Sequence, residues 1–188
     1  MKTAARIQNA ALTRFAAQGY AATTLKEIAS DCGIKKPSIY AHFASKEHLF
    51  KHLVRASVYG EMDYVRERLQ QPIPAAEALR SLLESVPARF RQSAALRFWV
   101  QALYAPPPAL ASEIRAYAGM YYSGLYSVVA ITLENGTQAR DRKQDMLATA
   151  YLGILQGLYG GLLRKQGEVE PEKTADALWT VYRRAMEA

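Results

Sequence analysis

Apolar residues recur every three or four positions along most of this chain, and the strand-like alternation of apolar and polar residues is missing. In the first stretch Ile7, Ala11 and Phe15 follow one another at a spacing of four, which is typical of one face of an α-helix. Glycine and proline residues divide the chain into segments of helical length. The pattern predicts an all-α protein of about nine helices.

Residues that start and stop helices mark four predicted helices in the first part of the chain. Thr24 and Glu27 have the spacing of a capping box, and Gly33 suits the left-handed position that follows a helix end. Pro37 suits the first turn of another helix. The four predicted helices cover about Thr3–Gln18, Thr24–Cys32, Pro37–His42 and a stretch that begins at Ser45.

Longer helices are predicted in the rest of the chain. Pro87 is expected to interrupt the helix that begins near Ala75, since proline breaks a helix interior. The three prolines at 106–108 should stop the next helix, and Gly136 and Gly167 should end the two after it. These later helices are predicted at about Ala94–Tyr104, Ala109–Glu134, Asp141–Lys165 and from Pro171 to the end of the chain.

Positive charge is concentrated at the start of the chain. Residues 1–55 hold nine basic and three acidic side chains, which accounts for +6 of the formal net charge of +7 on 188 residues. A basic block on a nearly neutral body is typical of a protein with a polyanionic partner. Half of the residues are apolar, so the chain can build a core and is not expected to be disordered.

Composition favours a cytoplasmic protein. Cys32 is the one cysteine, so no internal disulfide is possible, and no apolar run typical of a secretory signal precedes Gln8. Two uncharged stretches, 116–133 and 146–163, reach the length of a membrane span, but polar and small residues are spread along both. We expect two central helices buried on several faces, and no membrane.

The second and third predicted helices are short, and a tight turn at Gly33 joins them, so neither can be stable without the other. When their apolar residues face the first helix, the third leaves cationic and hydrogen-bonding residues outside. A helix of this kind fits the major groove of DNA, where its first turns reach base edges. The outward residues are Lys35, Lys36, Ser38, Tyr40 and His42.

The run from Ile7 to Phe50 resembles the DNA-binding domain of the tetracycline-repressor (TetR) family of transcriptional regulators. The resemblance implies a helix-turn-helix DNA-binding domain over residues 1–48, followed by a larger helical domain over 49–188 for ligand binding and dimerisation. The positions in register are Thr23, Thr24, Ile28, Ala29, Gly33, Tyr40, Phe43, Ser45, Lys46, Glu47 and Leu49.

The resemblance also implies which residues meet DNA. Lys36 and Ser38 are expected to read base edges, Lys36 at guanine O6 and N7. Thr24 and Lys46 should bind phosphates at the starts of their helices. The full predicted set is Thr24, Lys35, Lys36, Pro37, Ser38, Tyr40, His42 and Lys46.

The other members of this set are expected to contact the DNA backbone or a base methyl group. Tyr40 and His42 should contact phosphates or sugars, and Pro37 a thymine methyl. Lys35 stands where the family often has a small hydroxyl residue, so the cap of the third helix is in doubt while a charge is gained near phosphate. A pure capping role for Thr24, a core position for Tyr40 and a solvated lysine at 46 remain open.

Metal and cofactor chemistry is not expected. His48 and His52 lie four apart on one helical face, a spacing that metal ligands use. No cysteine or carboxylate stands at a suitable distance from them, so an ordinary surface or core pair is favoured. Paired catalytic carboxylates, a Ser/His/Asp set and a phosphate-binding glycine loop are likewise not found, which argues against an enzyme.

A glycine stripe marks a possible dimer interface. Glycine costs a helix about 1 kcal/mol relative to alanine, so several in one helix indicate a close approach of another helix. The resemblance implies that the last two helices of each subunit form a four-helix interface, with packing inside one chain as the alternative. The predicted interface residues are Gly153, Gly157, Gly160, Leu178, Trp179 and Tyr182.

The middle of the chain is rich in aromatic residues on two successive helices. The resemblance implies a cavity there for a small hydrophobic or aromatic effector, while an ordinary aromatic core is the alternative. The predicted effector-binding residues are Trp99, Leu103, Tyr117, Tyr121, Leu125 and Tyr159.

Together with these observations, the resemblance implies a bacterial, cytoplasmic repressor that is nucleoid-associated when bound. It is expected to occupy a palindromic operator on double-stranded DNA as a homodimer and to leave it when a small-molecule effector binds. A ligand-insensitive DNA-organising protein of the same fold is the main alternative.

Overall fold

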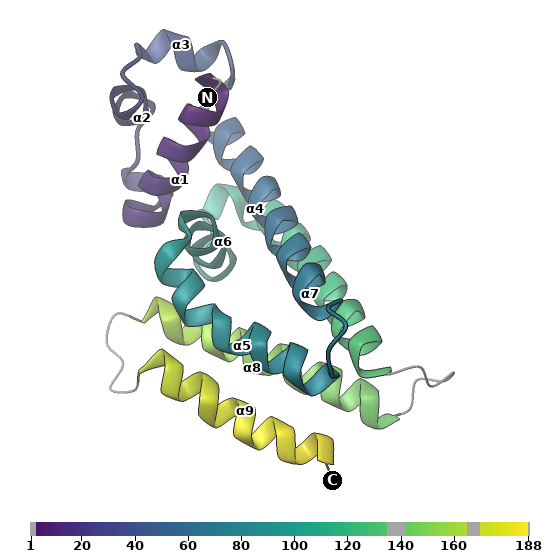
Figure 1. Cartoon of the computed structure of the whole chain (residues 1–188). Helices are drawn as coiled ribbons and strands as arrows, with labels where there is room; N and C mark the ends of the chain where they lie inside the picture. The colour runs from purple at the N-terminus through teal and green to yellow at the C-terminus, as the bar shows by residue number, and fades with distance from the viewer. Residues whose placement is uncertain (1–2, 135–141, 165–169, 188) are drawn as a thin grey trace. The chain divides into compact units, whose positions relative to one another are not determined.

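The computed structural model describes residues 3–134, 142–164 and 170–187, and all regular secondary structure in these ranges is helical. This confirms the predicted all-α class. Figure 1 labels the helices in chain order. They are α1 (Thr3–Ala22), α2 (Leu25–Asp31), α3 (Lys36–Tyr40), α4 (Lys46–Leu69), α5 (Ala75–Gln92), α6 (Ala94–Tyr104), the 3-10 turn η1 (Pro108–Leu110), α7 (Ala111–Glu134), α8 (Arg142–Leu163) and α9 (Pro171–Glu187).

The chain forms two compact units. The first combines residues 1–59 with 93–117, and the second combines residues 60–92 with 118–188, each within the described ranges. Both α4 and α7 contribute one part to each unit. The predicted boundary between a DNA-binding domain (1–48) and a ligand-binding and dimerisation domain (49–188) concerns function rather than compactness. It stays a prediction.

The first unit is built around α1, which packs against both α2 and α6 (Figure 1). Ile7, Ala11 and Phe15 are buried as their spacing predicts. Arg14 on the neighbouring face of α1 forms ion pairs with Asp31 at 2.6 Å and Glu27 at 3.1 Å on α2. Apolar burial and these ion pairs together fix the position of α2 beside α1.

The first helix is predicted to end at Gln18, but in the structure α1 kinks at Gly19 and continues beyond it. The φ of 78° and ψ of 176° at Gly19 are values that side-chain-bearing residues rarely adopt. One more helical turn follows the kink and ends at Ala22. The hydroxyl of buried Thr23 donates to the Gly19 carbonyl at 2.8 Å, which stabilises the kinked segment.

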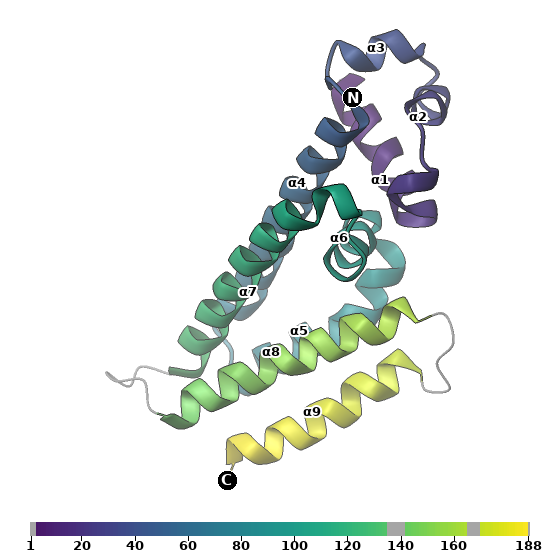
Figure 2. The same cartoon turned by 180° about the vertical axis from the view of Figure 1, so that it is seen from behind.

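In the second unit α5, α8 and α9 each pack against the other two (Figure 2). Glu61 of α4 is only 5% exposed and forms a two-pronged ion pair with Arg89 of α5, with one N–O distance of 3.0 Å. The Tyr159 hydroxyl of α8 donates to the same carboxylate at 3.1 Å. A buried charge is costly without such partners, so this cluster fixes three helices relative to one another.

The predicted interruption at Pro87 is wrong, because α5 continues through it to Gln92. Pro87 is buried in the apolar face of the helix, together with Leu83 and Val86. Burial of this apolar ring offsets the loss of one backbone hydrogen bond. The predicted stops Gly136 and Gly167 lie outside the described residues.

By length and composition alone, α8 is the one helix in the described ranges that could cross a membrane. A third of its apolar window is buried against the rest of the chain. Core helices of water-soluble proteins meet the same criterion, so this finding does not assign a membrane.

The geometry of Gly19 predicts a large effect of a single methyl group. Gly19→Ala should lower the free energy of unfolding by about 1–3 kcal/mol, because alanine is strained at this φ and ψ. Gly60→Ala is the matched control, since Gly60 is helical and nothing lies within 4 Å of an added Cβ. The control should be neutral or stabilising by up to about 1 kcal/mol in urea unfolding. Equal effects of the two substitutions would contradict the assigned strain.

Candidate nucleic-acid interface

The turn between α2 and α3 holds the two helices in a fixed arrangement. Gly33 has a φ of 61°, and its N–H donates to the Ser30 carbonyl at 2.9 Å. The N–H of Ile34 donates to the Ala29 carbonyl at 3.0 Å. These bonds satisfy carbonyl groups in the last turn of α2, as is usual for a helix that ends at a glycine. The chain therefore enters α3 in one fixed direction.

The outer face of α3 is cationic and open. Ile39 is its one buried residue and faces the core of the first unit. Tyr40 is 49% exposed, and the Lys36 ammonium lies 5.9 Å from the centre of its ring. The structure thereby brings five predicted DNA-binding residues together on one short exposed helix and its N-cap, namely Lys35, Lys36, Pro37, Ser38 and Tyr40.

Lys35 is the N-cap of α3 and makes no side-chain capping bond. This agrees with the expectation that the missing hydroxyl removes the cap. His42 follows α3 and is exposed. Its N–H donates to the Ile39 carbonyl at 2.9 Å, so its backbone position is fixed while its ring is open to solvent.

Thr24 forms the predicted capping box with Glu27. The Glu27 N–H donates to Thr24 Oγ1 at 3.2 Å, and the Thr24 N–H and hydroxyl each donate to Glu27 Oε2 at 2.8 Å. These bonds lower the pKa of Glu27, with the bond from the Thr24 hydroxyl as the largest cause. A phosphate at Thr24 would have to share donors that already serve the cap, a competition that the sequence did not indicate.

Lys46 lies at the start of α4, but its ammonium points into the first unit. It donates to the carbonyl of Tyr20 at 2.8 Å and to that of Thr23 at 3.0 Å. The same ammonium lies 4.1 Å from the centre of the Tyr20 ring. A solvated lysine would make none of these contacts, so Lys46 has a structural role that its place in the motif did not reveal. Its contact with phosphate stays a prediction.

The two histidines of α4 each take part in local packing. His48 Nδ1 accepts from the Ala44 N–H at 3.2 Å, and His52 lies 2.9 Å from Gln8 across to α1. The ring of Phe43 packs near both, with its centre 6.0 Å from that of His48 and 5.5 Å from that of His52. Within the described part of the chain, no three metal-ligating side chains gather.

The six predicted effector residues fall in different units. Trp99, Leu103 and Tyr117 belong to the first, and the other three to the second. In the second unit the hydroxyls of buried Tyr121 and Tyr159 lie 3.5 Å apart, beside the carboxylate of Glu61. Burial raises the pKa of both tyrosines, so both hydroxyls stay protonated. The remaining member, Leu125, is buried as well.

The predicted dimer residues separate into exposed and buried groups. Gly153 and Gly157 are exposed on α8, and nothing lies within 4 Å of an added Cβ at either. Trp179 and Tyr182 of α9 are 3% and 2% exposed, and the Tyr182 hydroxyl donates to the Leu147 carbonyl of α8 at 3.0 Å. The two aromatic side chains therefore pack within the chain. The last two members, Gly160 and Leu178, are partly exposed.

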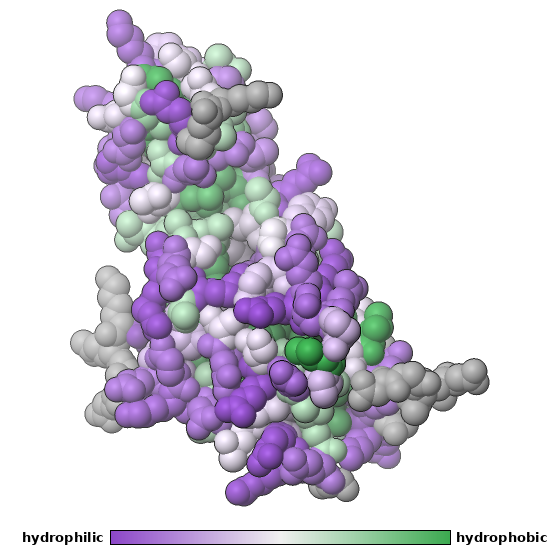
Figure 3. Space-filling view, viewed as in Figure 1, coloured by the Kyte–Doolittle hydropathy of each residue, from purple (hydrophilic) through white to green (hydrophobic). Residues whose placement is uncertain are grey.

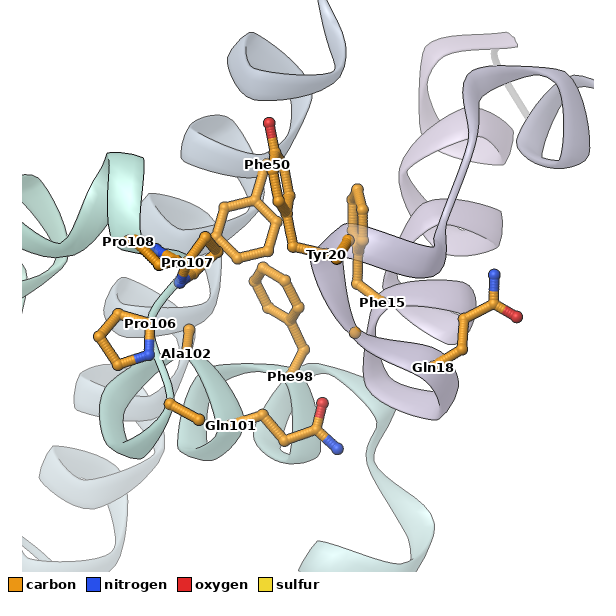
Figure 4. Close-up of a pocket in the computed structure, with 13 residues that line it drawn as sticks. Phe15, Gln18, Tyr20, Phe50, Phe98, Gln101, Ala102, Pro106, Pro107 and Pro108 are labelled. Carbon is orange, nitrogen blue, oxygen red and sulfur yellow. The ribbon is translucent and has the colours of Figure 1, made fainter.

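An apolar cavity of about 300 Å³ in the first unit was not predicted. Phe15 and Tyr20 of α1, Phe50 of α4 and Phe98 of α6 form its aromatic floor (Figure 4). Periodicity placed Phe15 on the apolar face of its helix, but the three helices that meet here are far apart in sequence. The sequence signal that could have indicated the cavity is Gly19. The helix kinks at this glycine, and the next residue, Tyr20, lines the cavity.

Comparison with known sequences finds relatives of the first part of the chain. Residues 7–53 match the family described as bacterial regulatory proteins, tetR family. The chain is 54% identical over 44 residues to the uncharacterized HTH-type transcriptional regulator YerO of Bacillus subtilis, covering 23% of this chain and 15% of YerO. It is 30% identical over 84 residues to the HTH-type transcriptional regulator UidR of Escherichia coli, covering 45% and 41%. The chain thus matches less than half the length of each of these relatives.

Solved structures share the fold of the whole chain. A TetR-like transcriptional regulator from a Rhodococcus species has a TM-score of 0.73 at 20% identity, covering 99% of this chain and 96% of that one. FadR from Bacillus subtilis, in complex with stearoyl-CoA, has 0.71 at 15%, covering 95% and 96%. AibR, in complex with isovaleryl coenzyme A and operator DNA, has 0.68 at 19%, covering 96% and 97%. At these identities the likeness shows the fold alone.

The contacts of Lys46 predict a loss of stability when its charge is removed. Lys46→Met keeps an apolar side chain of similar length but leaves two carbonyls without their charged donor, so the free energy of unfolding should fall by about 1–3 kcal/mol. The control is Lys26→Met, because Lys26 is exposed on α2. Urea unfolding at one protein concentration compares the two variants. If both unfold at the wild-type midpoint, the ammonium of Lys46 does not hold the three segments together.

Proposed function

We propose that this chain is a transcriptional regulator of the TetR family, a repressor that binds a palindromic operator as a homodimer and is released by a small-molecule effector. The family is one of transcriptional regulators rather than enzymes. The observation that carries the proposal is the exposed cationic face of α3 within the matched segment. We expect the protein to act in the bacterial cytoplasm, at the nucleoid when it is bound.

Recognition of DNA is assigned to the outer face of α3. Lys36 carries the longest flexible donor in its first turn, suited to guanine O6 and N7, and Ser38 can meet the neighbouring base edge. Pro37 meets a thymine methyl, while Tyr40, His42 and Lys35 bind the sugar-phosphate backbone beside the groove. Thr24 and Lys46 bind phosphates at the starts of α2 and α4, Lys46 through the helix end because its ammonium is engaged elsewhere.

A homodimer is proposed because one short α3 offers few base contacts. A two-fold axis would place two such helices about one turn of DNA apart, near 34–36 Å, which matches a palindrome. The glycines exposed on α8 support a close approach of a second copy, with Gly160 and Leu178 at the edge of the contact. Tyr182 supports the interface indirectly by holding α9 against α8, and Trp179 packs against the Tyr182 ring.

The effector is proposed to be small and hydrophobic or aromatic, and to act on the body of the protein. FadR and AibR, which share this fold, are described in complex with acyl-CoA molecules. In this chain the tyrosine hydroxyls beside Glu61 supply polar groups that could orient such a ligand among apolar side chains. The residues proposed for contact are Trp99, Leu103, Tyr117, Tyr121, Leu125 and Tyr159.

Release requires that the effector prefer the conformation that does not fit the operator. A shift from 1:99 to 99:1 between the two conformations needs a preference of about 5.5 kcal/mol. The alternative is a DNA-organising protein of the same fold without an effector. Operator affinity that stays constant across a broad panel of metabolites would favour this alternative.

Selection of genomic DNA fragments by the purified protein, near physiological salt, tests the proposed function. We expect one palindromic motif to be enriched, because two symmetric α3 helices read two half-sites. Genes beside the motif would then indicate the effector. Recovery of no motif, with binding that decreases smoothly as salt rises, would contradict a specific repressor.

Substitution of one residue on α3 tests the assignment of base contacts. Lys36→Ala should weaken binding to the selected palindrome by about 1–3 kcal/mol and relax base preference at one position of each half-site. Lys173→Ala removes the same charge from the exposed surface of α9 and should leave the preference unchanged. Binding is measured on a set of single-base variants. A uniform loss on all of them would show that Lys36 binds phosphate.

Substitution on α8 tests the proposed dimer. Gly157→Arg places a long charged side chain on the exposed stripe and should convert the dimer to a monomer, because close helix approach has no room for it. Gly119→Arg is the matched control, since Gly119 is exposed on α7 with nothing within 4 Å of an added Cβ. Sedimentation over a range of concentrations gives the oligomeric state. Dimers of equal stability in both variants would place the interface elsewhere.

A further inference from the structure

The first unit contains an apolar cavity that the proposed function does not use. It has a volume of about 300 Å³ and lies among α1, α4 and α6. None of the six residues assigned to the effector lines it. Figure 3 shows apolar surface gathered where α1 and α6 meet, in a part of the molecule that is otherwise largely hydrophilic.

The floor of the cavity is aromatic and its geometry is fixed. Phe50 makes edge-to-face contacts with Phe15, Phe98 and Tyr20, with ring centres 5.1, 4.9 and 4.9 Å apart. Edge-to-face pairs have preferred orientations, so these rings hold one another in place. Figure 4 shows the four rings turned toward one another, with three prolines on the opposite side.

The elements around the cavity are also tied together by polar contacts. The Gln101 side chain of α6 donates to the Ala16 carbonyl of α1 at 2.8 Å. Lys46 of α4 holds the backbone and ring of Tyr20. The cavity is therefore formed before any ligand arrives, which reduces the entropy cost of binding.

The lining defines the chemistry of a ligand. It contains no charged side chain, so an ionic ligand would lose its hydration without gaining a partner. The aromatic floor and the rings of Pro106, Pro107 and Pro108 suit a flat aromatic molecule. Gln18 and Gln101 lie at its edge, where their amide N–H groups already donate to the carbonyls of Ala22 and Ala16, so their amide oxygens are the polar groups left for a ligand.

The size of the cavity limits the ligand further. A volume of about 300 Å³ is at the lower end for small-molecule sites, which leaves room for one or two fused rings but not for a coenzyme A group. Buried Phe15, Phe50 and Phe98 form the interior, while exposed Gln18 and Ala21 form the rim. A ligand can therefore enter from solvent without a rearrangement of the core.

We propose that this cavity is a second small-molecule site, specific for a neutral planar aromatic compound of one or two rings that carries a hydrogen-bonding group at its edge. It is separate from the effector residues assigned above. Binding here is measured without DNA, so its outcome is independent of the proposed function.

Calorimetric titration with 2-naphthol, which is neutral at pH 7, tests the site in the full chain. Saturable binding of one molecule per chain is expected. The charged 2-naphthoate and the aliphatic octan-1-ol should bind at least about tenfold more weakly, because the site lacks charge and is aromatic. Failure of 2-naphthol to bind, or equal binding of all three compounds, would overturn the proposal.

A matched pair of variants locates the binding. Ala21 and Ala22 are adjacent and exposed on the last turn of α1, but only Ala21 lines the cavity. Ala21→Phe should weaken 2-naphthol binding at least about tenfold by filling the rim, and Ala22→Phe should leave it unchanged. Equal affinities in the two variants would place the compound elsewhere.

Methyl spectra of the wild-type protein give a readout that does not depend on how the variants fold. With carbon-13 in the alanine methyl groups, the ring current of 2-naphthol should shift Ala21, Ala102 and Ala105, all of which line the cavity. The Ala148 methyl of the second unit should not move. Largest shifts at alanines of the second unit would overturn the assignment of the site.

Discussion

The ammonium group of Lys46 connects three segments of the first unit at one point. Its two carbonyl partners, Tyr20 and Thr23, lie at the end of α1 and directly before the N-cap of α2, while Lys46 itself begins α4. The direction in which α2 and α3 leave α1 depends on this contact, as does the position of the Tyr20 ring over the cavity. One charged side chain therefore supports both the candidate DNA-binding surface and the candidate ligand site.

The second unit contains a buried ionic cluster of another kind. Glu61 and Arg89 come from α4 and α5, and Tyr159 adds a hydroxyl from α8. The Arg89 guanidinium also lies 3.3 Å from the centre of the Tyr64 ring, which covers its face. A buried pair of this kind contributes little net stability compared with apolar packing, but loss of one partner leaves a charge without compensation. The main effect of the cluster is therefore to select one arrangement of these helices. Its contribution to the free energy of unfolding is small.

Local signals predicted the fold well, and contacts between distant residues limited the prediction of sites. The capping box at Thr24 and the turn at Gly33 depend on residues a few positions apart, so the sequence alone indicated both. Pro87 was assigned as a break because its local rule ignores the burial that α5 provides. The same limit explains Lys46 and the aromatic cavity, whose partners are more than twenty residues away in the chain.

Net charge overstates how many cations of the first segment can meet DNA. Arg14 is paired with Asp31 and Glu27, and Lys51 with Glu47 and Glu113, while the ammonium of Lys46 faces inward. The cations that remain exposed on and around α3 are fewer than the nine basic residues of the segment suggest. Salt dependence of DNA binding follows the number of phosphates neutralised rather than the formal charge. The proposed affinity for an operator would therefore rest on a small set of well-placed contacts, and the two copies of α3 in the proposed dimer would supply twice as many as one.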